Sequence, residues 1–349
     1  MIERIERNRR RLRALYEARG PRYALIFEPL CSPRGGDLGD FTLSRKPVRL
    51  WLPWYVKYYE ESLRASAALD DDGVPFVNLN TNTGVFAAAF GCPLHAYQES
   101  GANACARPIV TSPAAADRLA LPTLAAPTLQ RVLELGQLLQ RELGPDVPIS
   151  VPDLQSPFDI ANLVWNKADL LLAMLDAPDA VKALIEKAHQ LLTAFLREFA
   201  RLFPQGNFCH CPHMWVPPEY GCHVSEDEIG IISPEMFDEF VLPSLQRLSA
   251  EFGGLWLHCC ADADHQYPGF ARIPNLRGLN RKFIRGPRRC IEMFSATALF
   301  SMGWTPEAEL LDLLDIALPA TRFLFNLSGF RSVEEARPVY DRLRARMPR

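Results

Sequence analysis

Residues 253–262, Gly-Gly-Leu-Trp-Leu-His-Cys-Cys-Ala-Asp, form a short apolar run that follows two glycines and ends at a histidine and two cysteines. A run of this length with such boundaries is typical of a buried β-strand. Because side chains alternate along a strand, His258 and Cys260 should share one face and Cys259 should lie on the other. An imidazole beside a thiol suits a soft divalent metal, above all zinc. The alternative interpretation is that the cysteines are ordinary small core residues.

Strand and helix patterns alternate on both sides of this run. We expect further strands at residues 23–27, 74–80, 148–153, 207–216, 276–280, 298–304 and 323–327, and helices that include 1–20, 127–143 and one beginning at Ser233-Pro234. No hairpin signal joins the strands, so the pattern predicts parallel βαβ units. About eight strands favour one α/β domain, a (β/α)₈ TIM-type barrel at residues 21–349, after an N-terminal helical extension at residues 1–20.

Composition places the chain among ordinary globular proteins, with 349 residues, 48% hydrophobic and 23% charged. A net charge of −3 and a pI of about 6.2 argue against nucleic-acid binding. We find no apolar run long enough to cross a membrane and no signal peptide, and therefore expect a cytoplasmic protein. The nine cysteines are scattered through a long chain, so we expect reduced thiols rather than a disulfide framework. The oligomeric state stays open.

In a barrel of this type the active site lies at the carboxyl ends of the strands. The candidate substrate-binding residues expected there are Asn80, Gln155, Asn280, Trp304 and Asn326. The amide side chains among them have an alternative role in capping helices and closing turns. Asp227 is the candidate catalytic residue, because a carboxylate over the pocket orients a substrate or stabilises charge as a bond breaks. Its alternative role is to bind loop amides.

Three stretches resemble the uroporphyrinogen decarboxylase superfamily. The first contains Asp227, Ile232–Pro243 and the two glycines before His-x-Cys. The second is Ser156-Pro157-Phe158-Asp159-Ile160-Ala161, and the third is Phe325-Asn326-Leu327-Ser328-Gly329-Phe330. The likeness covers most of residues 70–345. It implies a TIM-type barrel, in a superfamily that holds porphyrin decarboxylases and also zinc methyltransferases that work with corrinoid proteins.

The sequence departs from both branches of that superfamily. The arginine-rich N-terminal motif of the decarboxylases has no match, although Arg34 and Arg45 lie in the corresponding region. The methyltransferase branch is similar at His258 and Cys260, but Ser328 stands about where its last cysteine is expected. Since catalytic zinc normally has three protein ligands, we expect Cys222 as the third, with three alternatives. The alternatives are His223, His265 and Cys290.

The resemblance leaves three functional hypotheses. The first is a zinc-dependent methyltransferase that transfers a methyl group between a donor and an acceptor. The donor is a corrinoid carried by a partner protein, or a similar molecule, and the acceptor is a small thiol or another molecule. The second is a metal-independent decarboxylase or lyase of a carboxylate substrate. The third is a barrel that binds a corrinoid or another ligand without turnover.

Overall fold

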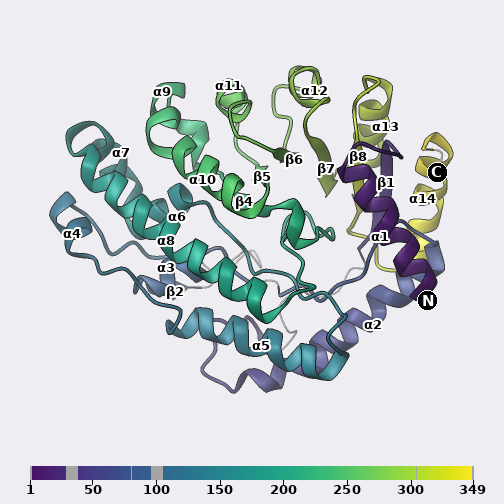
Figure 1. Ribbon diagram of the computed structural model, residues 1–349, viewed down its shortest axis with the longest axis horizontal. Helices are drawn as coiled ribbons and strands as arrows, with labels where there is room; N and C mark the ends of the chain where they lie inside the picture. The colour runs from purple at the N-terminus through teal and green to yellow at the C-terminus, as the bar shows by residue number, and fades with distance from the viewer. Residues whose placement is uncertain (1, 29–37, 80, 96–104, 304, 348–349) are drawn as a thin grey trace.

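The computed structural model describes residues 2–28, 38–79, 81–95, 105–303 and 305–347, in which helices and strands alternate (Figure 1). The α-helices are α1 (Ile2–Tyr16), α2 (Leu52–Leu69), α3 (Val85–Ala89), α4 (Pro113–Arg118), α5 (Pro127–Leu143), α6 (Pro157–Val164), α7 (Lys167–Asp176), α8 (Pro178–Leu202), α9 (Pro234–Met236), α10 (Leu242–Phe252), α11 (Tyr267–Phe270), α12 (Arg288–Phe294), α13 (Glu307–Asp315) and α14 (Val333–Arg346). The strands are β1 (Tyr23–Phe27), β2 (Leu94–His95), β3 (Cys105–Ala106), β4 (Cys222–Ser225), β5 (Leu255–Cys259), β6 (Leu276–Arg281), β7 (Leu299–Gly303) and β8 (Phe323–Leu327). Short 3₁₀ turns lie at Val48–Trp51, Pro218–Tyr220, Glu228–Ile231 and Asp264–Gln266, and a π-helical turn at Phe237–Val241.

The main sheet is parallel and has six strands in the order β1-β8-β7-β6-β5-β4. Helices connect successive strands from β4 onward, and in Figure 1 these strands form an arc inside a curved row of helices. Parallel pairing with helical crossovers is the predicted βαβ arrangement, so the α/β fold class is confirmed and is TIM-like. The separate hairpin of β2 and β3 is antiparallel.

Single contacts, rather than full strands, span the side of the sheet between β1 and β4. The nitrogen of Asp72 donates to Leu25, and a parallel bridge joins Val77 to Ile149. A second bridge joins Ser150 to Asn207. The segments expected to be strands near 74–79 and 148–153 are therefore extended pieces with isolated pairing. Among the described residues, eight continuously paired strands are not formed.

The segment expected to be a strand at 207–216 turns back on itself instead, so this prediction is wrong. The Asn207 side chain accepts from the backbone nitrogens of Cys209 (3.3 Å) and Val216 (2.8 Å), and donates to the carbonyls of Cys209 (3.2 Å) and Met214 (3.0 Å). One amide thus supplies bonds that a neighbouring strand would otherwise make. We call residues 209–216 the lumen segment, because they lie inside the curve of the sheet.

The lumen segment fills the interior of the sheet near the amino ends of its strands. Met214 and Trp215 pack in one buried cluster with Trp256 of β5 and Leu324 of β8. Leu12, Leu15 and Tyr16 of α1 belong to the same cluster, and the Tyr16 hydroxyl donates to the Trp215 carbonyl. Helix α1 therefore packs over the end at which the strands begin.

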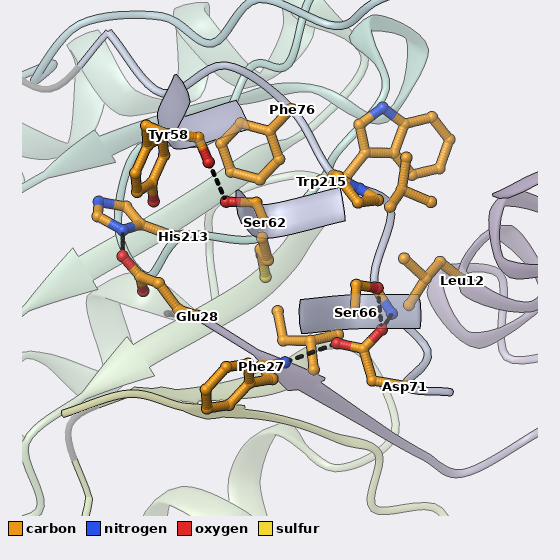
Figure 2. Close-up of a pocket in the computed structure, with 15 residues that line it drawn as sticks. Leu12, Phe27, Glu28, Tyr58, Ser62, Ser66, Asp71, Phe76, His213 and Trp215 are labelled. Carbon is orange, nitrogen blue, oxygen red and sulfur yellow. Dashed lines mark hydrogen bonds and ion pairs between the residues drawn. The ribbon is translucent and has the colours of Figure 1, made fainter. Parts of the chain in front are cut away.

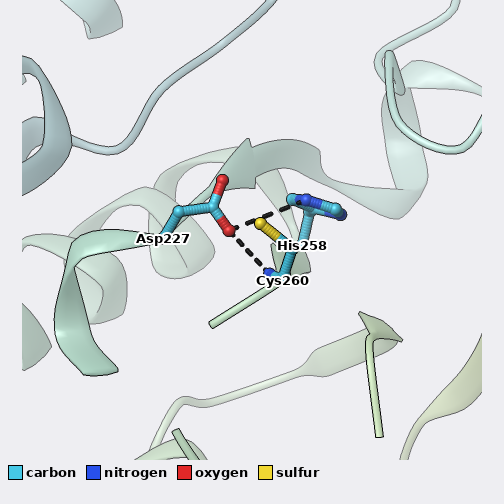
Figure 3. Close-up of side chains that lie close together, drawn as sticks. All are labelled: Asp227, His258 and Cys260. Carbon is cyan, nitrogen blue, oxygen red and sulfur yellow. Dashed lines mark hydrogen bonds and ion pairs between the residues drawn. The ribbon is translucent and has the colours of Figure 1, made fainter. Parts of the chain in front are cut away.

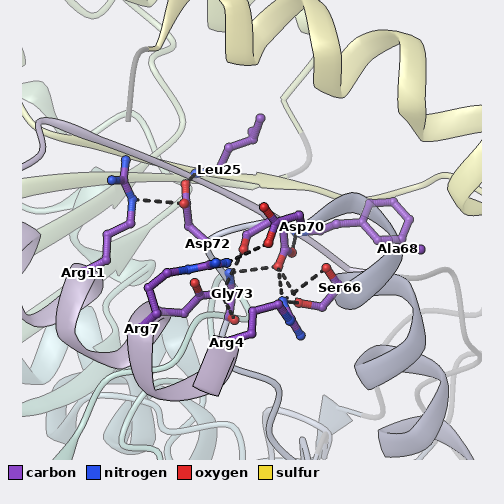
Figure 4. A network of polar contacts seen from close by, with 12 residues as sticks. Arg4, Arg7, Arg11, Leu25, Ser66, Ala68, Asp70, Asp72 and Gly73 are labelled. Carbon is purple, nitrogen blue, oxygen red and sulfur yellow. Dashed lines mark hydrogen bonds and ion pairs between the residues drawn. The ribbon is translucent and has the colours of Figure 1, made fainter. Parts of the chain in front are cut away.

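Helix α1 is also held by charge (Figure 4). Arg4, Arg7 and Arg11 are spaced three and four residues apart, so they share one face of the helix. This face meets three successive aspartates that follow α2. Arg7 pairs with Asp70 at 2.6 Å, Arg4 with Asp71 at 3.5 Å and Arg11 with Asp72 at 3.0 Å, and Arg344 of α14 pairs with Asp72 at 2.8 Å. We call these seven residues the arginine–aspartate network.

Several predicted boundaries are confirmed. The strands at 23–27 and 323–327 and the helix at 127–143 agree with β1, β8 and α5. The Ser233 hydroxyl accepts from the Met236 nitrogen at 3.2 Å and caps α9 as expected. None of the helices in the described parts of the chain is long and apolar enough to cross a membrane.

Candidate metal centre

Three possible metal ligands meet where β4 and β5 end (Figure 3). One donor atom from each of Asp227, His258 and Cys260 lies within 4.8 Å of the other two. His258 Nε2 is 3.7 Å from Asp227 Oδ1, and the Cys260 backbone nitrogen donates to the same oxygen at 2.7 Å. Cys259 is completely buried in the main core, in keeping with strand alternation. We call Asp227, His258 and Cys260 the mouth cluster.

The neighbouring strand orients the His258 ring. Asn280 of β6 lies beside His258 in the sheet register, and its amide nitrogen donates to the Ser301 carbonyl. The amide oxygen of Asn280 therefore faces His258 Nδ1, at 2.5 Å, and this nitrogen must carry the proton. The Nε2 atom is left on the side of Asp227 and Cys260. Histidines that bind metals are commonly oriented by such a hydrogen bond from the other ring nitrogen.

The carboxyl groups around the mouth cluster lack lysine and arginine partners among the described residues. Asp159 and Glu226 are buried directly behind Asp227, and among the described residues none of these three carboxyls forms an ion pair with lysine or arginine. Burial raises the pKa of both Asp159 and Glu226. Partial burial and then the Asp227 charge raise the pKa of the Cys260 thiol to about 12. A divalent cation would offset this charge and favour the thiolate.

The donor set fits a zinc-type ion. It offers an imidazole lone pair, a thiol and a carboxylate, which are the three ligand types that zinc takes in proteins. Three protein ligands at the edge of an open mouth also match the number found at catalytic sites, where one position stays free for water or substrate.

The structure does not bring Cys222 to this cluster, and this corrects its assignment as the third ligand. Cys222 is completely buried and lies opposite Leu255, whereas Ser225 lies opposite His258. Three residues along a strand correspond to about 10 Å. Cys222 therefore lies near the start of β4, and Asp227 near the site.

The three alternative ligands are also outside the mouth cluster, although the ring centroid of His223 lies 6.5 Å from that of His258. His265 Nε2 is bonded to the Ile232 carbonyl at 3.0 Å. Cys290 is completely buried on α12 in the helix layer. His223 is buried, and its Nδ1 lies 3.1 Å from Nδ1 of His210. Burial and neighbouring histidines lower the pKa of both His210 and His223 well below the usual value, so this pair is neutral.

The tip of the lumen segment reaches the mouth, which the sequence did not reveal. Cys211 Sγ lies 3.4 Å from His258 Nδ1, so a thiol from another part of the chain contacts the candidate ligand. Pro212 packs on Gly303 of β7, where an added Cβ would lie only 2.8 Å from the proline ring. The His213 carbonyl accepts from Asn326 at 2.8 Å. The segment thus contacts β5, β7 and β8.

The remaining predicted residues are dispersed. Asn280 lies beside the mouth cluster, as described above. Gln155 donates to Asp153 at 2.5 Å, and Asp153 lies 3.6 Å from His210 Nε2. Asn326 donates to Glu28 at 3.2 Å, on the side of the mouth formed by β1 and β8. Asn80 and Trp304 lie outside the described residues.

A second hollow lies between β1, α2 and the lumen segment (Figure 2). Tyr58, Phe76 and Trp215 line it together with Glu28, which is hydrogen-bonded to His213. Its volume of about 50 Å³ has room for a few water molecules but not for an organic substrate. The mouth cluster is therefore the better candidate for chemistry.

Comparison with known proteins agrees with this fold. Residues 72–202 match the family model described as Uroporphyrinogen decarboxylase (URO-D). A solved structure, a methyltransferase from Methanosarcina mazei, superposes with a TM-score of 0.67 over 95% of this chain and 98% of that chain, at 16% sequence identity. No curated protein matches the sequence. The family match and the shared fold confirm the resemblance of this chain to the uroporphyrinogen decarboxylase superfamily that its sequence motifs indicated.

Proposed function

We propose that this protein is a zinc-dependent methyltransferase whose metal ligands are Asp227, His258 and Cys260. The observation that carries the proposal is the convergence of three suitable donors, with His258 Nε2 on the side of the other two, in a place where none of the described lysines or arginines pairs with the carboxyl groups. Zinc bound there would lower the pKa of an acceptor thiol, so that the acceptor is a thiolate at neutral pH.

The side chains around the cluster have defined roles in this proposal. Asn280 orients the His258 ring and keeps its proton on Nδ1. Asp227 supplies negative charge and accepts the Cys260 backbone N–H, which fixes the turn after β5. The lumen segment occupies the interior of the sheet, so a substrate approaches from the mouth. We infer that the acceptor is small, because Cys211 already lies against His258.

The methyl donor in this proposal is a corrinoid carried by a partner protein, or a similar methyl donor. Support comes from the sequence resemblance and from the similar fold of a protein named a methyltransferase. The reduced cysteines expected from the sequence agree with the cytoplasmic location that we predict.

The alternative function is a metal-independent decarboxylase or lyase, supported by the description of the matching family. Asp227 would then stabilise charge without a metal. A barrel that binds a ligand without turnover is the remaining alternative. Metal content and turnover separate these possibilities.

We also propose that the parallel sheet and its single bridges form one (β/α)₈ barrel at residues 21–349. The bridges at Val77, Ile149 and Asn207 support this proposal, because they continue the sheet from β1 towards β4. Residues 1–20 stay assigned to the N-terminal helical extension.

Metal analysis of protein purified without chelators tests the proposed function. We expect about one zinc per chain in the wild type and a loss of metal in His258→Ala and in Cys260→Ala. Cys259→Ala is the matched control, because Cys259 lies on the opposite strand face and should leave metal content unchanged. Methyl transfer from methylcobalamin to a small thiol should depend on the same residues. Wild-type protein that neither contains nor takes up zinc would contradict the proposal.

A further inference from the structure

One motif of the sequence, Ser156-Pro157-Phe158-Asp159, has no role in the mouth cluster as described so far. The structure places this motif beside the end of β4. The Ser156 nitrogen donates to the Ser225 carbonyl at 2.8 Å, and the Ser156 hydroxyl accepts from the Asp159 nitrogen at 3.0 Å. Serine therefore caps α6, with proline in the first turn, and holds the start of this helix against the strand that leads to Asp227.

The Asp159 carboxylate bonds the backbone of the candidate ligand itself. Its Oδ2 accepts from the Asp227 nitrogen at 2.6 Å and its Oδ1 accepts from the Glu228 nitrogen at 3.2 Å. These two nitrogens follow one another where the chain leaves β4, and Asp159 is almost completely buried. One carboxylate thus holds the turn from which the Asp227 side chain extends to Cys260 and His258.

A carboxylate suits this position better than any other small side chain. Each of its two oxygens accepts from one of two adjacent N–H groups, so a single side chain satisfies both. Asparagine would direct its amide N–H₂ at one of those N–H groups. Burying a carboxyl group without a basic partner is costly, as the raised pKa of Asp159 shows, and the helix cap does not require it, because the Ser156 hydroxyl makes that bond.

We propose that Asp159 is a positioning residue for the metal centre: it fixes the backbone of Asp227, and through it the direction of the Asp227 carboxylate. The inference rests on the proposed function, in which Asp227 is a metal ligand. It gives the Ser-Pro-Phe-Asp motif a place in the site although Asp159 and Asp227 are far apart in the sequence.

The test compares Asp159→Asn with Ser156→Ala, using zinc and cobalt as the probes. Zinc affinity is measured by competition with a chromophoric chelator. The coordination geometry of the cobalt-loaded protein is followed by its absorption spectrum. Both measurements are made well below the unfolding temperature of each variant. Asp159→Asn should bind zinc about 10–100-fold more weakly, the range typical of lost outer-shell partners, with an altered cobalt spectrum. Ser156→Ala should unfold at a lower temperature but keep wild-type zinc affinity and spectrum, because it weakens only the cap.

Two further results decide the inference. In wild-type protein, hydrogen exchange at residues 226–229 should slow on zinc saturation, a measurement that does not depend on the variant folding. Wild-type affinity and spectrum in Asp159→Asn, or unchanged exchange with zinc bound, would overturn the role of Asp159. A wild type that binds no zinc would instead reject the proposed function, so the two failures are distinguishable.

Discussion

The arginine–aspartate network and the mouth cluster differ in whether basic side chains pair with their carboxyl groups. In the network each of Asp70, Asp71 and Asp72 pairs with an arginine, and Asp72 pairs with two. In the mouth, the one basic group within ion-pair distance of Asp227 among the described residues is His258 (Figure 3). The network gathers its three acids from one continuous segment after α2, whereas the mouth brings Asp159 of α6 close to Asp227 after β4. Among the described residues, arginines balance the acids of the network, and no lysine or arginine pairs with those of the mouth.

The difference indicates what each region is for. A carboxylate matched by arginines is satisfied within the fold, and its removal affects stability. A carboxylate that lies with a thiol and an imidazole and has no lysine or arginine partner among the described residues is consistent with the metal site that we propose. Charge balance therefore separates a structural acidic cluster from a candidate site more clearly than the number of acids does.

The largest expected effect belongs to Asp72→Asn in the network. The variant keeps an oxygen that can accept from the Leu25 nitrogen but removes the negative charge that pairs with Arg11 and Arg344. We expect a loss of about 2–4 kcal/mol in the free energy of unfolding, near the lower end of values for buried pairs because both arginines are partly exposed. Denaturant titration measures this. Metal content should not change, and a change there would break the separation of the two regions.

An intermediate effect is expected at Cys260 in metal-free protein. With the thiol pKa raised to about 12, alkylation by iodoacetamide should be slow at pH 8 and should still accelerate with pH beyond pH 10, because the thiolate fraction keeps growing. Asp227→Asn removes the nearby negative charge and should lower this pKa, which speeds alkylation up to roughly tenfold per unit of pKa. Peptide mass spectrometry resolves the site. Equal rates in both proteins would show that the Asp227 charge does not govern the thiol.

The smallest effect is expected for Arg7→Ala at the edge of the network. Arg7 pairs with Asp70 at 2.6 Å, but both side chains are about half exposed. Water screens such a pair, so the free energy of unfolding should change by less than about 1 kcal/mol. Thermal and denaturant unfolding beside Asp72→Asn gives the measurement. A loss of stability as large as that of Asp72→Asn would mean that solvent exposure does not determine how much each ion pair of the network stabilises the fold.

The sequence predicted the elements whose pattern is local. The run at Leu255–Cys259 is a strand because apolar residues end at polar ones, and His258 and Cys260 come together at its end as period-two alternation requires. Asp227 was predicted to lie near the end of a barrel strand, and it does follow β4, although β4 itself was not among the predicted strands. Its place beside both possible ligands could not be predicted, because it depends on how β4 pairs with β5.

The sequence failed where distant residues decide the outcome. Residues 207–216 have the alternation of a strand, but the Asn207 amide replaces the partner strand and folds the segment inward. Cys222 was expected as a ligand from its closeness in sequence. The register of β4 and β5 instead pairs His258 with Ser225, three residues after Cys222. Asp159 lies in a motif that was noticed, yet its carboxylate acts on Asp227 across a gap that only the tertiary fold closes.

The lumen segment has a consequence for engineering. In most barrels the interior is assembled from side chains on every strand, so its redesign demands many coordinated substitutions. Here much of the interior comes from one continuous stretch that is tied at both ends to the Asn207 side chain. A library of cassettes exchanged between residues 208 and 216 would therefore vary the floor of the mouth while every strand keeps its native sequence. Asn207 should be kept in all such cassettes, because both its donor and its acceptor are in use.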